Sequence, residues 1–318
     1  MTVELPPRME TISVHDIDEL AERMKAFGWN MLHRQIEGGA FAGELIVAQL
    51  AGMQFARMTY NRGIRSRGDS PAGTIAIAVP LSVPRSLHWH GYNLSPDHAL
   101  LQKSSLGLDF LRRGDFPLAL VSISIDSLLE AAELTGRTRV ESLVLDDTRT
   151  IRPDAGAVDR FRFHFQNLFP AIRSPQTLPP ELAAIIRADF LDLMLDLLES
   201  NQTSPPFRPS SRYSFIKRAE EMLLENLDRP LAVTDLCKEI HVSERTLRYG
   251  FRECFGMAPA AYLKAQRLNG VRRQLKAGDG ATVSDVAIQW GFWHMGQFAK
   301  DYRKMFGESP SQTLRRGS

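Results

Sequence analysis

Cysteine is nearly absent from this sequence, and so are long apolar runs. The 318 residues contain only two cysteines, Cys237 and Cys254, which is poor material for a disulfide framework or a zinc site. No apolar run approaches the roughly 20 residues that cross a bilayer. The first residues are acidic and lack the apolar core of a signal peptide. We therefore expect a cytoplasmic protein without a membrane partner.

Signatures of nucleotide-binding and hydrolytic enzymes are also missing. The chain has neither a phosphate-binding P-loop nor a dinucleotide-binding glycine fingerprint. The stretch GDSPAG around Ser70 is similar to a serine-hydrolase nucleophile turn, but Ala72 replaces the last glycine of G-x-S-x-G. No His/Asp pair that would activate Ser70 is evident. We therefore expect no enzyme, no catalytic residue and no cofactor.

The composition, 43% hydrophobic and 24% charged, is that of a globular protein long enough for two domains. Its charge is unevenly distributed. From Arg212 to Ser318 there are 18 Lys/Arg against 12 Asp/Glu, a balance of +6, whereas the preceding residues carry 21 against 25, a balance of −4. The basic C-terminal third suggests an anionic partner for that end of the chain.

One stretch of this basic region is repeated. Residues 233–259 and 283–310 match at an offset of 50 in their first part and of 51 from Leu247 and Phe298 onward. The second copy therefore has one extra residue, which we expect in its turn. A repeat of this kind indicates duplication of one supersecondary unit.

Each copy reads as a helix, a tight turn and a second helix. In the first copy, His241 falls in the turn, Ser243 is a good N-cap, and Gly256 ends the second helix. In the second copy Gly291 makes the turn. An apolar residue recurs every four positions along each second helix and predicts its buried stripe: Leu247, Phe251 and Phe255, then Phe298, Tyr302 and Phe306.

The remaining positions of the second helices carry side chains that hydrogen-bond base edges and phosphates. The candidate DNA-binding residues are Ser243, Arg245, Arg248, Tyr249, Arg252, His294, Gln297, Lys300 and Arg303. Short amphipathic helix pairs also occur in ordinary bundles. Here, however, residues 260–278 predict a rigid helix between the copies, able to hold two recognition helices about one DNA turn apart, roughly 34 Å.

These residues carry a family resemblance. The stretches DLCKEIHVSERTL, RLNGVRRQL and QWGFWHMGQFAKDY resemble the DNA-binding domain of AraC/XylS transcription regulators, and most of all the branch that contains the ethanolamine-utilisation regulator. The resemblance implies a homodimeric activator that binds promoter DNA, contacts RNA polymerase and senses a small effector. One departure concerns residues 293–296, Trp-His-Met-Gly, where the family commonly has small polar residues.

The N-terminal two-thirds of the chain has a different pattern, which predicts strands in place of helices. Short β segments between about residues 40 and 125, punctuated by Gly and Pro, predict a sandwich or barrel, and the resemblance implies a cupin-like barrel that binds the effector. The expected fold class is α+β, with this barrel and its helices at the N-terminus and an all-α domain of two helix-turn-helix units (233–256 and 283–307) joined by a linker helix. The expected domains are 1–174 for effector sensing, 175–200 for dimerisation, 201–211 as a Pro/Ser-rich linker and 212–318 for DNA binding.

Two motifs within the front part bear on its ligand. His88, His90 and His98 are similar in spacing to the metal ligands of enzymatic cupins, but the usual carboxylate is absent from the following residues. We therefore assign no metal site. A metal-dependent cupin enzyme with a DNA module remains an alternative, as does a DNA-binding protein that has no ligand.

The second motif is a cluster of arginines followed by Asp and Ser. On a strand, Arg65 and Arg67 would point to the same face, and guanidinium groups bind phosphates bidentately. The pattern resembles the way PilZ domains bind cyclic di-GMP, although the spacing differs, and solvated hairpin arginines are the competing interpretation. The candidate effector-binding residues are Arg57, Arg62, Arg65, Arg67, Asp69 and Ser70.

The two lines of reasoning leave the effector open. The arginines favour a phosphate-bearing ligand such as cyclic di-GMP, whereas the resemblance of the C-terminal third favours ethanolamine or a related small amine, with or without cobalamin. We prefer the anionic ligand on chemical grounds.

Overall fold

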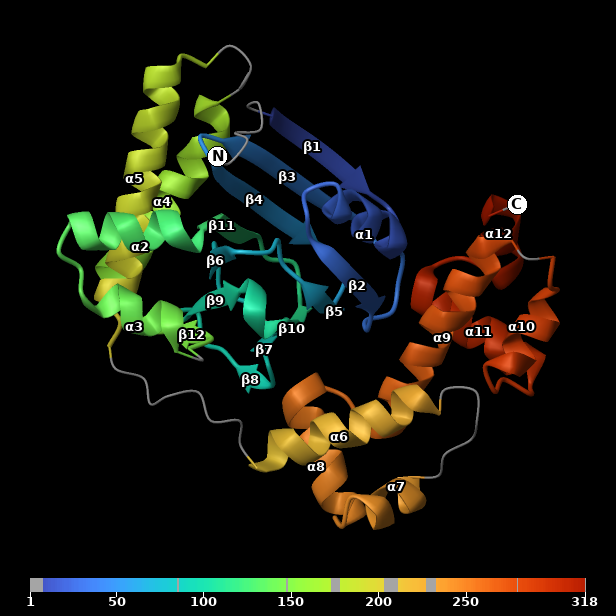
Figure 1. Cartoon of the computed structure of the whole chain (residues 1–318). Helices are drawn as coiled ribbons and strands as arrows, with labels where there is room; N and C mark the ends of the chain where they lie inside the picture. Colours follow the sequence, from blue (N-terminus) through green and yellow to red (C-terminus); the bar gives the residue numbers. More distant parts are fainter. Residues whose placement is uncertain are drawn as a thin grey trace.

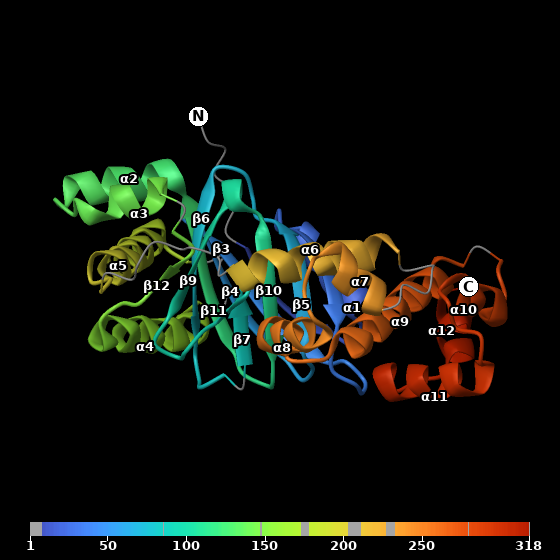
Figure 2. The ribbon, with the colours of Figure 1, turned by 90° about the horizontal axis from the view of Figure 1, so that it is seen from below.

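The structure is a computed structural model of the chain, and it describes residues 8–84, 86–146, 148–172, 178–202, 211–226, 233–278 and 280–317. The described elements lie in layers: a group of helices, a seven-stranded sheet, a five-stranded sheet, and the C-terminal helices (Figures 1 and 2). The expected mixed architecture, with sheets in the N-terminal part and helices in the C-terminal part, is confirmed.

The seven-stranded sheet is antiparallel and carries most of the strands that the sequence predicts. In order across the sheet its strands are β1 (Arg8–Val14), β3 (Gly43–Leu50), β4 (Met53–Tyr60), β11 (Leu118–Ser124), β6 (Thr74–Pro80), β9 (Ala99–Lys103) and β12 (Thr150–Ile151). Both of its faces are covered, which is why strands such as β6 and β11 are almost continuously apolar.

The five-stranded sheet is also antiparallel. It is ordered β2 (Asn30–Gln35), β5 (Ile64–Asp69), β10 (Leu108–Arg113), β7 (Ser86–Trp89) and β8 (Tyr92–Asn93). Side chains alternate between its faces. On β5, Ile64 belongs to the core between the sheets, whereas Arg65 and Arg67 point to the outer face, as the sequence predicts.

A core of apolar side chains fills the space between the sheets and is closed by helix α1 (Ile17–Lys25) through Leu20 and Met24. The cupin-like barrel is not confirmed. Among the described residues, hydrogen bonding joins the strands into two separate sheets and closes no barrel. The chain changes sheet between consecutive strands, as between β4 and β5, where the sequence suggested a hairpin.

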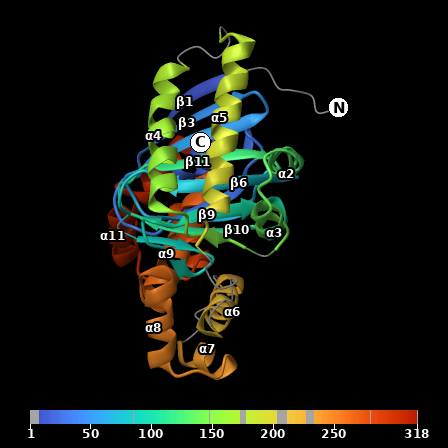
Figure 3. The same cartoon turned by 90° about the vertical axis from the view of Figure 1, so that its left-hand side faces the viewer.

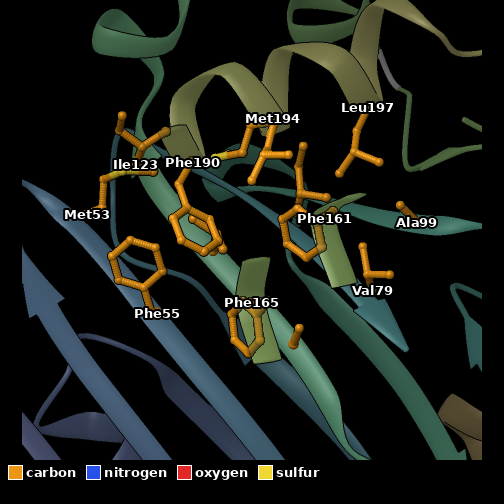
Figure 4. Packing of buried hydrophobic residues seen from close by; sticks show 14 of the residues in the cluster. Met53, Phe55, Val79, Ala99, Ile123, Phe161, Phe165, Phe190, Met194 and Leu197 are labelled. Carbon is orange, nitrogen blue, oxygen red and sulfur yellow. The ribbon is translucent and has the colours of Figure 1, made fainter. Parts of the chain in front are cut away.

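Four helices cover the outer face of the seven-stranded sheet (Figure 3). They are α2 (Ile125–Leu134), α3 (Arg139–Leu145), α4 (Ala155–Ala171) and α5 (Pro180–Glu199), and a short 3-10 helix (Ser104–Leu106) precedes β10. Phe190 of α5 lies 4.9 Å, ring centre to ring centre, from Phe55 of β4, and Phe161 and Phe165 of α4 complete this aromatic cluster (Figure 4). Within the described ranges, no helix is long and apolar enough to span a membrane.

The sequence predicts an apolar face on helix α5 that includes Leu182, Ile185, Phe190, Met194 and Leu197, and this face fits either packing on its own domain or a dimer contact. The C-terminal half of the helix packs on its own sheet through Phe190, Met194 and Leu197 (Figure 4). Near the N-terminal end of the helix, Leu182 and Ile185 are 42% and 55% exposed. Intramolecular packing therefore accounts for half of the predicted face.

The C-terminal helices are α6 (Ser211–Glu225), α7 (Val233–Glu239), α8 (Glu244–Phe255), α9 (Pro259–Ala277), α10 (Val283–Gln289), α11 (Met295–Phe306) and α12 (Pro310–Gly317). Helices α6 to α8 and the start of α9 share one core, and the rest of α9 shares a second core with α10 to α12. The first core includes Ile36 and Leu111, so it continues onto the five-stranded sheet. Most of the expected linker, residues 203–210, lies outside the described residues.

Candidate nucleic-acid interface and effector site

The first helix-turn-helix unit consists of α7, a turn at residues 240–243, and α8. His241 takes the left-handed conformation (φ 57°) that reverses the chain. The Ser243 hydroxyl caps α8 by accepting a hydrogen bond from the Thr246 backbone N–H at 3.1 Å. Gly256, at φ 65°, ends the helix. The predicted turn, cap and helix end are confirmed.

The second unit repeats this plan with α10, a turn at residues 290–294, and α11. A capping box between Thr282 and Asp285 begins α10, Gly291 (φ 78°) makes the turn, and Gly307 (φ 75°) ends α11. The turn is one residue longer than residues 240–243, as predicted. The six stripe residues are buried: Leu247, Phe251, Phe255, Phe298, Tyr302 and Phe306.

The two units are held together along α9. Leu268, Val271 and Leu275 of this helix are buried, and Leu263 is partly buried. Gly270 is required for the close packing of Trp290, because a Cβ atom at position 270 would lie 2.2 Å from the Trp290 ring. The Trp290 indole N–H also donates a hydrogen bond to Gln274 at 2.8 Å. The glycine within RLNG therefore fixes the second unit on the connecting helix.

Both recognition helices present a polar, cationic outer face. All nine candidate DNA-binding side chains are exposed, namely Ser243, Arg245, Arg248, Tyr249, Arg252, His294, Gln297, Lys300 and Arg303. The Arg245 guanidinium lies over the Tyr249 ring, 5.2 Å from its centre. In Figure 2, α8 and α11 both lie along the lower edge of the molecule. The candidate list omits Trp293, which is 66% exposed just before α11.

The predicted arginine site is built from two parts of the chain. The Arg65 guanidinium contacts Asp109 of β10 at 2.9 Å and Glu220 of α6 at 3.0 Å. Arg67 contacts the same two carboxylates, and its Nη2 lies 3.4 Å from Asp109. Glu220 lies 155 positions from Arg65, and no local sequence pattern pairs them. The two arginines therefore bind the C-terminal helices to the five-stranded sheet.

Aromatic side chains of the C-terminal helices enclose this ion-pair cluster. Tyr262 of α9 donates its hydroxyl hydrogen to Glu220, and Tyr213 of α6 donates to Asp109 at 3.1 Å. The Arg65 guanidinium also lies 4.4 Å from the centre of the Phe255 ring. Arg65, with 4% exposure, and Glu220, with 1%, are buried in this contact.

The opposite charges of the cluster stabilise one another's ionised forms although they are buried. Burial alone would raise the pKa of Asp109, but Arg65 and then Arg67 outweigh it and hold that pKa below its usual value. Burial would lower the pKa of Arg65, but Asp109 and Glu220 raise it. Both groups are therefore charged at neutral pH.

The structure does not bring all six candidate effector-binding residues together. Arg57 lies in the other sheet, paired with Glu44 at 2.9 Å. Arg62 lies in the turn before β5 and donates to the Asn61 carbonyl. Asp69 is exposed at the end of β5, whereas Ser70 is buried and accepts a hydrogen bond from Gln102 at 3.3 Å.

A second set of contacts holds α9 against β2 and α1. The Gln35 backbone N–H donates to the Asn269 side chain at 3.0 Å, and the Asn269 amide donates to the Gln35 carbonyl at 2.9 Å. Arg272 contacts Asp16 at 2.6 Å, and Lys276 contacts Asp16 at 2.8 Å. The C-terminal helices are therefore docked at two places, through α6 and through α9.

The three histidines of the metal pattern serve other contacts. His88 donates through Nε2 to the Glu253 carbonyl at 2.7 Å, His90 contacts Arg149 at 2.9 Å, and His98 lies beside Asp97. In the described part of the chain, no three His, Cys, Asp or Glu side chains form a group that could hold a metal ion.

A cavity of about 50 Å³ lies between the sheets. Apolar side chains form most of its wall, together with His33, Tyr60, Trp89 and Gln102. Each of these four has one polar atom without a hydrogen-bond partner among the described residues. Burial lowers the pKa of His33 to about 4, so its ring is neutral at physiological pH. Among the described residues, no carboxylate belongs to the cavity wall.

Two helix-turn-helix units on one connecting helix define the class of the C-terminal part. Residues 236–316 match a protein family described as a helix-turn-helix domain. Over 102 residues the chain is 36% identical to the probable thc operon regulatory protein of Rhodococcus erythropolis, covering 31% of each protein. It is 31% identical over 123 residues to XylDLEGF operon transcriptional activator 2 of Pseudomonas putida, covering 38% of this chain and 77% of that protein.

Among solved structures, a probable AraC family transcriptional regulator from Rhodopseudomonas palustris is 35% identical, covering 33% of this chain and 97% of that one, with a TM-score of 0.32. With 31% identity over most of the Pseudomonas putida protein, the chain belongs to the AraC family of transcription regulators. It spans between 22% and 38% of the length of six other curated relatives, because the similarity concentrates in the C-terminal third.

Proposed function

We propose that this protein is a sequence-specific DNA-binding transcription regulator, an activator, and that α8 and α11 read the DNA. The observation that supports this is the pair of 12-residue recognition helices, each ended by a left-handed glycine, whose nine candidate side chains are all exposed. Two such helices on one side of a rigid α9 suit adjacent major grooves. The protein acts on promoter DNA in the cytoplasm, with RNA polymerase as its further partner.

The DNA-binding role is tested by removing one phosphate contact and one base contact. Lys300→Ala should weaken binding to all sequences and lower the salt slope of log affinity by about one unit. Gln297→Ala should weaken binding to the preferred site by about 1–3 kcal/mol and leave random DNA unaffected. Lys25→Ala, which removes an exposed lysine of α1, is the control. If Gln297→Ala lost affinity equally on both DNAs, its role as a base-reading residue would be wrong.

The proposed effector is an anionic ligand that carries phosphate groups, with cyclic di-GMP as the candidate, bound at Arg65 and Arg67. Two neighbouring guanidinium groups on the outer face of β5 already hold the Glu220 carboxylate. A phosphate presents the same kind of oxygen acceptors with more charge. Of the six candidate effector-binding residues, we keep Arg65, Arg67 and the nearby Asp69, which share a strand. Arg57 is left out because it lies in the other sheet.

Effector binding and docking would compete for the same two arginines. Glu220 belongs to α6, the first of the C-terminal helices, so a ligand that replaces its carboxylate removes the main polar contact between α6 and the sheet. We propose that the docked arrangement is the resting state. The ligand then shifts the population toward an undocked state in which both recognition helices can reach DNA.

The competing effector is ethanolamine or a related amine. An ammonium group binds a carboxylate or an aromatic cage. Among the described residues, the wall of the cavity between the sheets has no carboxylate, but Trp29, Tyr60 and Trp89 line it. Calorimetric titration with cyclic di-GMP, and with ethanolamine in the presence and absence of cobalamin, separates the candidates. Binding of the dinucleotide that is lost in an Arg65→Ala, Arg67→Ala double variant supports the arginine site. Binding of the amine alone would refute it.

We also propose a homodimer in which residues 1–174 sense the effector, 175–200 dimerise, 201–211 link the parts and 212–318 bind DNA. Because the C-terminal half of α5 is buried in its own core, the proposed dimer contact within residues 175–200 is limited to the exposed apolar side chains Leu182 and Ile185. An Ile185→Glu variant should be monomeric in sedimentation experiments. A dimer that survives this change would place the interface elsewhere.

A further inference from the structure

The two recognition helices are alike in backbone but differ in the side chains at their N-terminal ends. Both have 12 residues, begin directly after the turn of their unit and end at a left-handed glycine. Position by position, they correspond at an offset of 51. Arg245 therefore occupies the place of Gly296, and Arg248 occupies the place of Ala299. The first helix has arginine at two sites where the second has almost no side chain.

N-terminal residues of a recognition helix are those that reach base edges. Arginine there pairs bidentately with the O6 and N7 atoms of guanine. Arg245 is well prepared for this contact, because its guanidinium lies over the Tyr249 ring at 5.2 Å and loses less rotamer freedom when it binds. Arg252 lies two turns further along α8, in the last turn of the helix.

The second helix offers different chemistry near its own N-terminal end, where Gln297 corresponds to Thr246 of α8 and Trp293 to Val242. Gln297 pairs bidentately with adenine through N6 and N7. Trp293, which is 66% exposed immediately before the helix, offers an apolar ring that suits a thymine methyl group. Apart from its own helix, no described part of the chain has a heavy atom within 4 Å of the place where a Cβ would stand at Gly296, so DNA can approach the backbone closely there.

We infer that the protein reads an asymmetric site: a guanine-bearing half-site under α8 and an A·T half-site under α11, about one helical turn or 10 base pairs apart. Trp293 and Gly296 are specificity-determining positions of the second half-site. The inference depends on the proposed DNA-binding function and extends it to the composition of the operator. It follows from the unequal side chains on two equal helices.

Selection of binding sites from a random double-stranded DNA library tests this inference. The full chain is used, in parallel with a Glu220→Gln variant in which docking is weakened, so that a docked arrangement does not conceal the recognition helices. Two enriched half-sites are expected, one with guanine and one with A·T. Each bidentate contact should discriminate against the wrong base by about 5- to 150-fold.

Substitutions at equivalent positions assign each half-site to its helix. Gly296→Arg, which copies Arg245 into α11, should introduce a guanine preference in the A·T half-site. Gly296→Ala is the control, because it removes the glycine without adding a guanidinium. Arg245→Gln should change the guanine of the other half-site to adenine and leave the A·T half-site unaltered.

The outcomes separate this inference from the proposed function. Enriched sites with guanine in both halves of the wild-type selection would overturn the inference and leave DNA recognition intact. The same conclusion would follow if Gly296→Arg selected the wild-type sequence. If neither protein enriched any sequence, sequence-specific binding itself would be wrong, and the inference with it.

Discussion

Replacing Glu220 by glutamine should undock α6 from the five-stranded sheet and raise the affinity of the protein for DNA. The carboxylate of Glu220 is 1% exposed and contacts both Arg65 and Arg67. The substitution removes one negative charge from a buried cluster and retains nearly the same shape. It therefore perturbs the docked arrangement far more than an undocked one, in which the arginines are solvated.

The free energy by which this substitution weakens docking depends on the ion-pair partners that remain. Breaking a buried ion pair by removing one partner costs about 3–5 kcal/mol, because the other charge stays buried without compensation. Here Asp109 still contacts both arginines, at 2.9 Å and 3.4 Å, so the lower end of the range applies. About 3 kcal/mol corresponds to roughly a hundredfold change in the ratio of undocked to docked molecules, since each 1.4 kcal/mol is a factor of ten.

Fluorescence anisotropy with a selected DNA site measures this shift directly, and small-angle scattering reports the accompanying expansion. The control is Glu221→Gln, which makes the same charge change on the next residue of α6, where the side chain is exposed. Glu220→Gln should bind DNA up to about a hundredfold more tightly, and Glu221→Gln should match the wild type. Equal DNA affinity and equal dimensions for all three proteins would refute the docking role of the cluster.

Two further predictions concern α9. Burial would raise the pKa of Asp16, but Arg272 and other basic groups outweigh burial and hold that pKa at about 2, below the usual 3.8. The ionised Asp16 therefore stabilises the folded protein above about pH 4, and this stabilisation is lost as the pH falls toward 2. Asp16→Asn should lower the free energy of unfolding by about 2 kcal/mol at pH 7, and in denaturant titrations from pH 7 to pH 2 its difference from the wild type should disappear at the acid end. Gly270→Ala should lower the free energy of unfolding by about 1–3 kcal/mol, because its Cβ would lie 2.2 Å from Trp290. The control is Gly296→Ala, at an open helical site, which should not destabilise the protein. Thermal unfolding measures both variants, and equal melting temperatures would contradict the close-packing role of Gly270.

The helix-turn-helix units could be predicted in detail because their determinants are local. A stripe every four residues, a Ser243 cap and a glycine in the left-handed conformation at each helix end are all encoded within a few residues of where they act. Even the extra residue in the second turn follows from the change of offset between the copies. Such signals survive tertiary packing because packing uses the same apolar faces.

The arrangement of the candidate effector-binding residues could be predicted only in part, for an equally physical reason. Strand alternation is a local property, so it correctly placed Arg65 and Arg67 on one face. Sheet membership is not local. β4 and β5 are consecutive in the sequence but belong to different sheets, and Arg57 is therefore separated from Arg65. Nothing near Glu220 indicates that its carboxylate will occupy the arginine pair, because the contact joins residues 155 positions apart.

The position of Glu220 on α6 has a thermodynamic consequence for the whole protein. If a ligand at Arg65 and Arg67 excludes the Glu220 carboxylate, ligand and DNA both favour the undocked state. Linkage then requires reciprocity: whatever factor the ligand adds to DNA affinity, DNA must add to ligand affinity. Because the coupling works through the docked population, Glu220→Gln should bind both partners more tightly and reduce the coupling factor toward one. A ligand that bound the variant and the wild type with the same coupling would act by a route other than this carboxylate.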